Sequence, residues 1–423
     1  MTSKNKKDIL KIAQDYEGLL KVEVTDMADS SPIEGAKITI ASLDNPEETI
    51  EELSTDANGM SPLLPLEAPP RELSENPNST IQPYSEYNMI ITAPGYEPTS
   101  ISGSEIFESE LSLQPVRLRP IFASSASDVI NIPANTLWGD YPPKIPEAEI
   151  KPIQVSGEVV LSRVVVPEYI VVHDGVPTDS TAKNYYIPYR DYIKNVASSE
   201  IYSTWPDATL RANIIAIMSF TLNRVYTEWY RSKGYDFTIT SSTAYDHKFI
   251  YGRNFFDSIS QIVDEIFASY VSRPNVKQPI LTQYCDGKRT TCPNAMSQWG
   301  SKYLGDEGYS ADEILRYYYG SNAYINEAEE ISGVPSSWPG YSLTIGSSGQ
   351  KVRQLQEQLN VISNDYRSIK KLSADGIYGE NTQEAVKEFQ RIFSLPQTGV
   401  VDYKTWYKIS AIYVAVSKIA QLV

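Results

Sequence analysis

The chain has 423 residues, more than one hydrophobic core usually serves, so we expect two to four domains. Its formal net charge of -16 argues against nucleic-acid binding, which needs clustered basic residues to neutralise phosphate. The sequence shows no secretory signal and no apolar run near the length of about 18 residues that spans a membrane. Nucleotide-binding, zinc-peptidase and serine-hydrolase motifs are absent too, which leaves carboxylate chemistry as the main possibility.

The first 165 residues differ from the rest in charge and pattern. They hold 26 acidic and 12 basic side chains, against 27 and 25 in the remainder, which indicates two parts with different tasks. We expect a helical segment over residues 1–17. Residues 18–118 contain short alternating apolar runs, such as "LLKVEVTD" and "AKITIAS", separated by turn residues, and this pattern predicts a β-sandwich.

Residues 119–165 read as a connector. Prolines at positions 133, 142, 143, 146 and 152 disfavour helices and central strands, so we expect an extended chain. The run "LSRVVVPEYIVVH" follows, with a single basic residue. This run is either a buried strand or an accessible protease cleavage region, whose candidate residues are Arg163, Val164, Val165 and Val166.

Residues 166–330 mix helices with short extended pieces. Apolar periodicity predicts helices over residues 207–230, 258–270 and 311–319, and Ser310 with Glu313 has the spacing of a capping box. Residues 340–420 show further helical periodicity with glycine-rich turns between the apolar stretches. The predicted fold class is therefore multidomain α+β, with a compact helical domain at the C-terminal end.

Glu200 is the most suggestive acid in the chain. It lies in "NVASSEIYSTWPDATL", among small and apolar residues, and such surroundings make a carboxyl group hold its proton more tightly. An acid of this kind can protonate the leaving oxygen of a glycosidic bond. An ordinary exposed helix acid is the alternative on these residues alone.

Two segments resemble the SpoIID-type lytic transglycosylases. "VASSEIYSTWPDATLRANIIAIMSFTLNR" is similar to the catalytic segment of that family, and "MSQWGSKYLGDEGYSADEILRYYYG" is similar to its closing segment. The resemblance implies a catalytic α+β domain over residues 166–330 with Glu200 as the catalytic acid. It also implies cleavage between N-acetylmuramic acid and N-acetylglucosamine that leaves a 1,6-anhydromuramic end. The helix is poorer in alanine than is usual in the family.

The same resemblance suggests further site residues and leaves the cysteines open. Candidate sugar contacts are Tyr245, His247, Tyr284, Asp286 and Gln298, each with a structural hydrogen bond as the alternative. Cys285 and Cys292 could form a local disulfide, remain free thiols, or bind a metal with His247. Their spacing is long for a zinc site and no fourth ligand is evident, so we expect neither a metal nor a cofactor.

The two ends of the chain resemble known modules. "PIEGAKITI", "TDANGM" and "APGY" recur in carboxypeptidase-regulatory and transthyretin-like sandwiches. "GSSGQKVRQLQEQL", "DGIYGENTQEAVKEFQ" and "TGVVDYKTWYKI" are similar to the three-helix peptidoglycan-binding domain. That second resemblance implies wall binding by exposed residues, for which we name Asp375, Tyr378 and Asn381.

The order of these three parts resembles the germination-specific spore cortex-lytic enzymes of clostridia. That group implies a precursor stored in the spore, at the cortex or its outer boundary, and activated when a subtilisin-like germination protease removes the N-terminal part. Residues 18–118 would then be a pro-domain. The alternatives are a muramidase or amidase that hydrolyses peptidoglycan, and a non-catalytic wall-binding protein of the spore.

Overall fold

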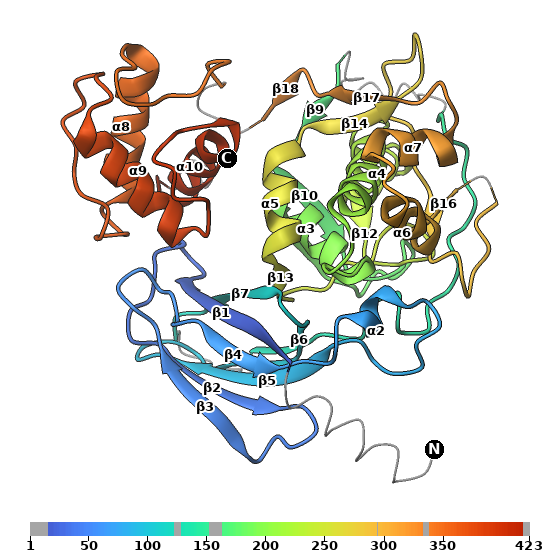
Figure 1. Ribbon diagram of the computed structural model, residues 1–423, viewed down its shortest axis with the longest axis horizontal. Helices are drawn as coiled ribbons and strands as arrows, with labels where there is room; N and C mark the ends of the chain where they lie inside the picture. Colours follow the sequence, from blue (N-terminus) through green and yellow to red (C-terminus); the bar gives the residue numbers. More distant parts are fainter. Residues whose placement is uncertain (1–15, 122–127, 152–162, 294, 333–337, 418–423) are drawn as a thin grey trace.

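The computed structural model describes residues 16–121, 128–151, 163–293, 295–332 and 338–417, which form three bodies (Figure 1). A β-sandwich and a small helical domain both contact a larger central domain. The helical segment that we predicted for residues 1–17 lies almost wholly outside the described residues. None of the described helices combines the length and the apolarity that crossing a bilayer requires.

The N-terminal body is a sandwich of two sheets. Alternating apolar residues such as Val22, Val24, Ile38 and Ile40 are fully buried between the sheets, as the sequence pattern predicts. One sheet has the order β3-β2-β5-β6-β8, made of Thr49–Ser54, Lys37–Ser42, Ser85–Thr92, Thr99–Ile106 and Asp128–Asn131. The other has the order β13-β7-β1-β4, made of Phe255–Phe256, Leu111–Leu118, Glu17–Asp26 and Leu64–Glu67. Strand β13 belongs to the central part of the chain, so this sheet joins two bodies.

The central domain is built around helix α4, Asp207–Tyr226, which is buried on nearly all sides. The helices α3, α5, α6 and α7 lie around it (Figure 1), with bounds Tyr189–Glu200, Asp257–Ile266, Gln298–Asp306 and Ala311–Tyr319. Short strands complete the domain: β9 Val165–Val166, β10 Tyr169–His173, β11 Asn184–Pro188, β12 Ile239–Thr240, β14 Ser269–Ser272, β15 Tyr284–Cys285, β16 Met296–Ser297, β17 Tyr324–Glu327 and β18 Glu330–Ile331. Helices α4 and α5 end four residues before the predicted positions, and α7 has both its predicted bounds and the Ser310–Glu313 capping box.

The C-terminal body contains three helices, α8 Gln350–Ile362, α9 Glu380–Ile392 and α10 Tyr403–Ser417. Their apolar faces enclose Leu355, Leu359, Phe389 and Trp406. Helix α10 packs against α5 of the central domain: the rings of Tyr407 and Phe267 meet edge to face, and Arg190 donates a hydrogen bond of 2.9 Å to the carbonyl of Tyr407. The helical domain is thus docked on the face of α5 rather than separate from it.

The connector is packed on the central domain. Its described part after β8, residues 132–151, runs along the surface of the central domain without helix or strand and with a turn at residues 136–138 (Figure 1), and we call this segment the strap. Its backbone pairs with the central domain from one end to the other, for example from Thr136 N–H to Ser199 O at 2.9 Å and from Ile145 N–H to Ala244 O at 2.7 Å. Residues 136–138 form a turn instead of the extended chain that we predicted, and residues 122–127 and 152–162 lie outside the described part.

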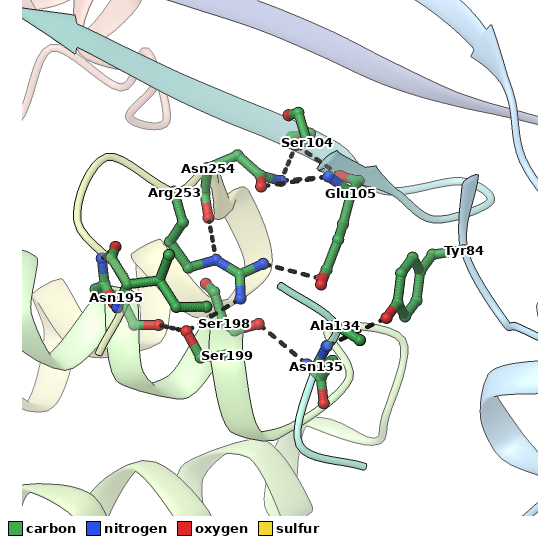
Figure 2. Close-up of polar contacts among 12 residues, drawn as sticks. Tyr84, Ser104, Glu105, Ala134, Asn135, Asn195, Ser198, Ser199, Arg253 and Asn254 are labelled. Atoms are coloured by element: carbon green, nitrogen blue, oxygen red, sulfur yellow. Dashed lines mark hydrogen bonds and ion pairs between the residues drawn. The ribbon is translucent and has the colours of Figure 1, made fainter. Parts of the chain in front are cut away.

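A buried polar cluster joins the sandwich, the strap and the central domain (Figure 2). The guanidinium of Arg253 donates to Glu105 on β6 at 2.9 Å and to the Ser199 hydroxyl on α3 at 3.1 Å, and both Arg253 and Glu105 are fully buried. Asn254 donates to the backbone carbonyl of Glu105, and Asn135 of the strap donates to the carbonyl of Ser198. The sandwich is therefore held to the helix that carries Glu200.

We predict that Arg253→Ala lowers the free energy of unfolding by about 3–5 kcal/mol, because it leaves the Glu105 carboxylate buried without its partner. Urea unfolding of the intact chain measures this loss. The control is Lys370→Ala, which breaks the exposed pair with Glu384 and should change stability by less than about 1 kcal/mol. Equal effects of the two substitutions would contradict the importance of the buried pair.

Candidate functional site

Glu200 is the last residue of α3, and its side chain is 2% exposed. Pro188 is the N-cap residue and lies outside the helical conformation, and the chain becomes extended again at Ile201. The small residues Ala197, Ser198 and Ser199 let this helix end pack closely in the core. The helix around Glu200 was not predicted from the sequence, because Ser, Asn and β-branched residues are weak helix formers and burial supplies the stability here.

Both carboxylate oxygens of Glu200 accept hydrogen bonds. The backbone N–H of Lys248 donates to Oε1 at 2.7 Å, and the hydroxyl of Tyr284 donates to Oε2. Burial and the neighbouring carboxylate raise the pKa of Tyr284 well above its usual value, so that its hydroxyl keeps its proton and remains a donor. The described contacts of the Glu200 carboxylate include no arginine, and the group is fixed in place by two neutral donors.

The two segments that resemble SpoIID-type enzymes meet at this point. Gln298, at the start of α6, donates to the backbone carbonyl of Glu200 at 3.0 Å. The ring of Trp299 lies 4.9 Å from that of Trp205, which follows Glu200 in the chain. Gln298 therefore holds the end of α3, the structural alternative that we stated for this residue, and the two segments form one structural unit around Glu200.

His247 lies beside the acid and is fully buried. Its ring stacks on that of Tyr284 at 6.0 Å, and its Nδ1 lies 3.0 Å from the hydroxyl of Tyr192. Burial, together with the nearby cations Lys144 and Arg224, lowers the pKa of His247 well below its ordinary value, so the imidazole is neutral. We assign His247 to the support of Tyr284, because the structure gives it no exposed surface for a sugar.

The other predicted site residues lie around this centre. Tyr245 is half-buried, and Asp286 orders the loop after β15 by accepting the backbone N–H of Thr290 at 2.9 Å. Cys285 and Cys292 form a disulfide that closes this loop. Within the described residues no three His, Cys, Asp or Glu side chains gather as a metal site, and the disulfide occupies both thiols that could have served as ligands.

The strap covers the acid, a feature that we did not foresee from the sequence. Thr136 of the strap contacts the backbone of Ser199 and Glu200. The ammonium of Lys144 lies 4.8 Å from the ring centre of Tyr284 and donates to the carbonyl of Asp246. Burial lowers the pKa of Lys144, while the carboxylates of Glu200 and Asp246 oppose that effect. Access to Glu200 from the strap side therefore requires the strap to move.

The predicted cleavage region does not have the accessibility that we expected. Arg163 is exposed and pairs with Glu330, but Val164 and Val166 are 3% and 2% exposed. Val165 and Val166 form β9, which pairs in parallel with β18. A protease needs several residues in extended form, so a cut at these positions would first require β9 to leave its sheet. The buried strand, the alternative that we stated, is what the structure contains.

One of the predicted wall-binding residues is buried. Tyr378 is 1% exposed, and its hydroxyl donates to the carbonyl of Gly399 at 2.9 Å, so its ring supports the domain instead of facing solvent. Asp375 and Asn381 are exposed as predicted. Asp375 also accepts a hydrogen bond from Gln356, which orders the turn before α9. The glycine and aspartate spacing of this turn could not reveal which way the tyrosine points.

Comparisons with known proteins identify one of the three bodies. Residues 348–409 match the family described as peptidoglycan binding domain, so the chain carries a peptidoglycan-binding domain and has a role associated with the cell wall. No curated relative matches the chain.

Two solved structures share local similarity. The SleB N-terminal domain is 27% identical over 18% of this chain and 99% of its own, with a TM-score of 0.16. The 5-hydroxyisourate hydrolase of Klebsiella pneumoniae is 16% identical over 26% of this chain and 97% of its own, with a TM-score of 0.17. At these TM-scores neither similarity carries an argument about the whole molecule.

Proposed function

We propose that the protein is a peptidoglycan lytic transglycosylase that degrades spore cortex during germination, of the SleC type of clostridial cortex-lytic enzyme. The observation that carries the proposal is the Glu200 carboxyl, buried and held by Tyr284 and the Lys248 N–H where the two SpoIID-like segments meet. The peptidoglycan-binding domain supports the same substrate, because it would hold the enzyme on an insoluble polymer and raise the local substrate concentration.

A single carboxyl group suffices for the proposed reaction. Protonated Glu200 gives its proton to the glycosidic oxygen, and the bond from that oxygen to C1 of muramic acid breaks. As a carboxylate, Glu200 then takes the proton of the muramic C6 hydroxyl while that oxygen attacks C1, which forms the 1,6-anhydro ring and regenerates the acid. The Tyr284 hydroxyl stabilises the charged form between these two steps.

We also propose that the chain is a precursor activated by a subtilisin-like germination protease. The strap and the sandwich both precede the central domain, and the strap lies over Glu200. A cut must come after Lys151 for the strap to leave with the N-terminal part. It must come before Val164, because Val164 and strand β9 pack inside the central domain.

Product analysis of the protease-treated protein tests the reaction. We expect muropeptides that end in 1,6-anhydromuramic acid, and a loss of at least about 1,000-fold in rate for Glu200→Gln, because the amide can transfer no proton. Mass spectra of digested cortex measure both. Reducing muramic ends would identify a muramidase instead, free stem peptides an amidase, and activity retained in Glu200→Gln would remove this residue from the mechanism. No activity in any processed form would favour the non-catalytic wall-binding protein.

For Tyr284→Phe we expect kcat to fall about 10- to 100-fold with little change in KM, since the variant removes one hydrogen bond to a charged group. Steady-state rates on soluble peptidoglycan fragments measure the change. The matched control is Tyr230→Phe, which removes a buried tyrosine hydrogen bond to Asp246 instead. A Tyr284→Phe enzyme with normal kcat would show that the contact to Glu200 is only structural.

The position of the cut is the second test of activation. Sequencing of the new N-terminus after protease treatment should find a first residue between positions 152 and 164, a segment that includes residues outside the described part of the chain. A new N-terminus before residue 145 would mean that Lys144 stays on the processed chain. An active product of that kind would contradict the idea that the strap must leave.

A further inference from the structure

We infer that the strap occupies the binding groove of the substrate, and that the side chains which now hold the strap bind amide groups of peptidoglycan once it leaves. The inference rests on the proposed function for the identity of the polymer. It assigns a binding role to Gln278, Gln283 and Arg289, none of which we singled out from the sequence.

The first observation is how residues 278–283 receive the strap. The side-chain amide of Gln283 donates to the carbonyl of Ile145 at 2.8 Å and accepts the N–H of Glu147 at 3.1 Å. The side-chain amide of Gln278 makes the same two contacts with Lys151, at 3.1 and 2.8 Å. Between them, the N–H of Leu281 donates to the carbonyl of Glu149 at 2.9 Å. This segment thus presents a row of donors and acceptors that matches the amide groups of an extended chain.

The second observation lies at the other end of the strap, beside Glu200. The guanidinium of Arg289 donates to the carbonyls of Thr136 at 2.6 Å and Trp138 at 3.0 Å, and it also contacts the carbonyl of Gly139. Its Nε donates to Asp286 at 3.0 Å, within the loop that the disulfide closes. Asp286 therefore orients the guanidinium toward the strap, and its two terminal nitrogens donate to strap carbonyls.

Loss of the strap would free the hydrogen-bonding positions that it now fills, while Gln278 would keep its contact with Asn223 and Arg289 its contact with Asp286. Once exposed, these amide and guanidinium groups would bind water, and a ligand with the hydrogen-bonding pattern of the strap would replace that water at positions that the fold already orients. Peptidoglycan carries that pattern in two places, the N-acetyl groups of its sugars and the peptide bonds of its stems. Each has one N–H and one C=O, the pair that a glutamine side chain recognises at two points.

Lys144 of the strap lies over two aromatic rings beside Glu200. The ammonium lies over the ring of Tyr284 at 4.8 Å and over that of Phe220 at 5.7 Å, beside the Glu200 carboxylate. An aromatic platform next to the catalytic acid is a surface on which a sugar ring can lie. The strap thus places a cation where the sugar being cut would sit, and its backbone where the amide groups would lie.

A displacement experiment tests the inference without requiring any cleavage. The protein carries Glu200→Gln, is processed by protease and freed of its N-terminal piece, and is then mixed with a fluorescent synthetic peptide of residues 132–151. Polarisation then follows release of the peptide by soluble glycan strands without stems, and separately by free stem peptide. We expect the peptide to bind and at least one of the two fragments to displace it competitively, and the fragment that does so identifies the source of the amide groups.

Substitutions in the groove give the second arm. Gln283→Leu and Arg289→Leu should each weaken binding of the displacing fragment about tenfold, while the neighbouring exposed Lys288→Ala should leave it unchanged. Failure of the peptide to bind, failure of both fragments to displace it, or unchanged affinity in both groove variants would overturn the inference. A processed wild-type enzyme that cuts no cortex, while displacement still occurs, would instead refute the proposed reaction alone.

Discussion

The Arg253 guanidinium is fully buried, and the packing of the sandwich on the central domain depends on how its charge is neutralised. Glu105 of the sandwich supplies the opposite charge, and Ser199 of α3 supplies a further acceptor. Because Ser199 is the residue before Glu200, the sandwich is linked by two hydrogen bonds to the end of the helix that carries the acid. Because a buried arginine needs an opposite charge, the position of the β-sandwich is linked to the end of α3 that carries Glu200.

The strap shows how a segment without regular secondary structure can be fixed to another domain by many hydrogen bonds. Its prolines carry no N–H, so an extended chain on the surface of another domain has fewer donors to satisfy. The donors and carbonyls that remain are paired by Gln278, Gln283, Arg289 and backbone groups of the central domain. The contacts of these three side chains join residues more than a hundred positions apart, which explains why the proline content could not predict where the strap lies.

Local signals predicted local structure well. The Ser310 and Glu313 pair placed the start of α7 correctly, and the alternation of apolar residues identified the sandwich strands. Glu200 could be predicted to lie in an apolar setting, but its partner Tyr284 could not, because only the tertiary fold brings the two together. Tyr378 was misplaced for a related reason: a tyrosine in a turn can face either way, and the space beneath the turn decides.

The shared sheet has a consequence for any processed form of the chain. Strand β13 of the central part of the chain is hydrogen-bonded to β7 of the sandwich, so both contribute strands to one sheet. A cut in the chain between them leaves these hydrogen bonds in place. After cleavage the two pieces would be separate molecules that still pair, and their separation would follow a dissociation constant. Lytic activity would then rise with dilution of the nicked protein, as it does for any enzyme held by a reversible inhibitor subunit.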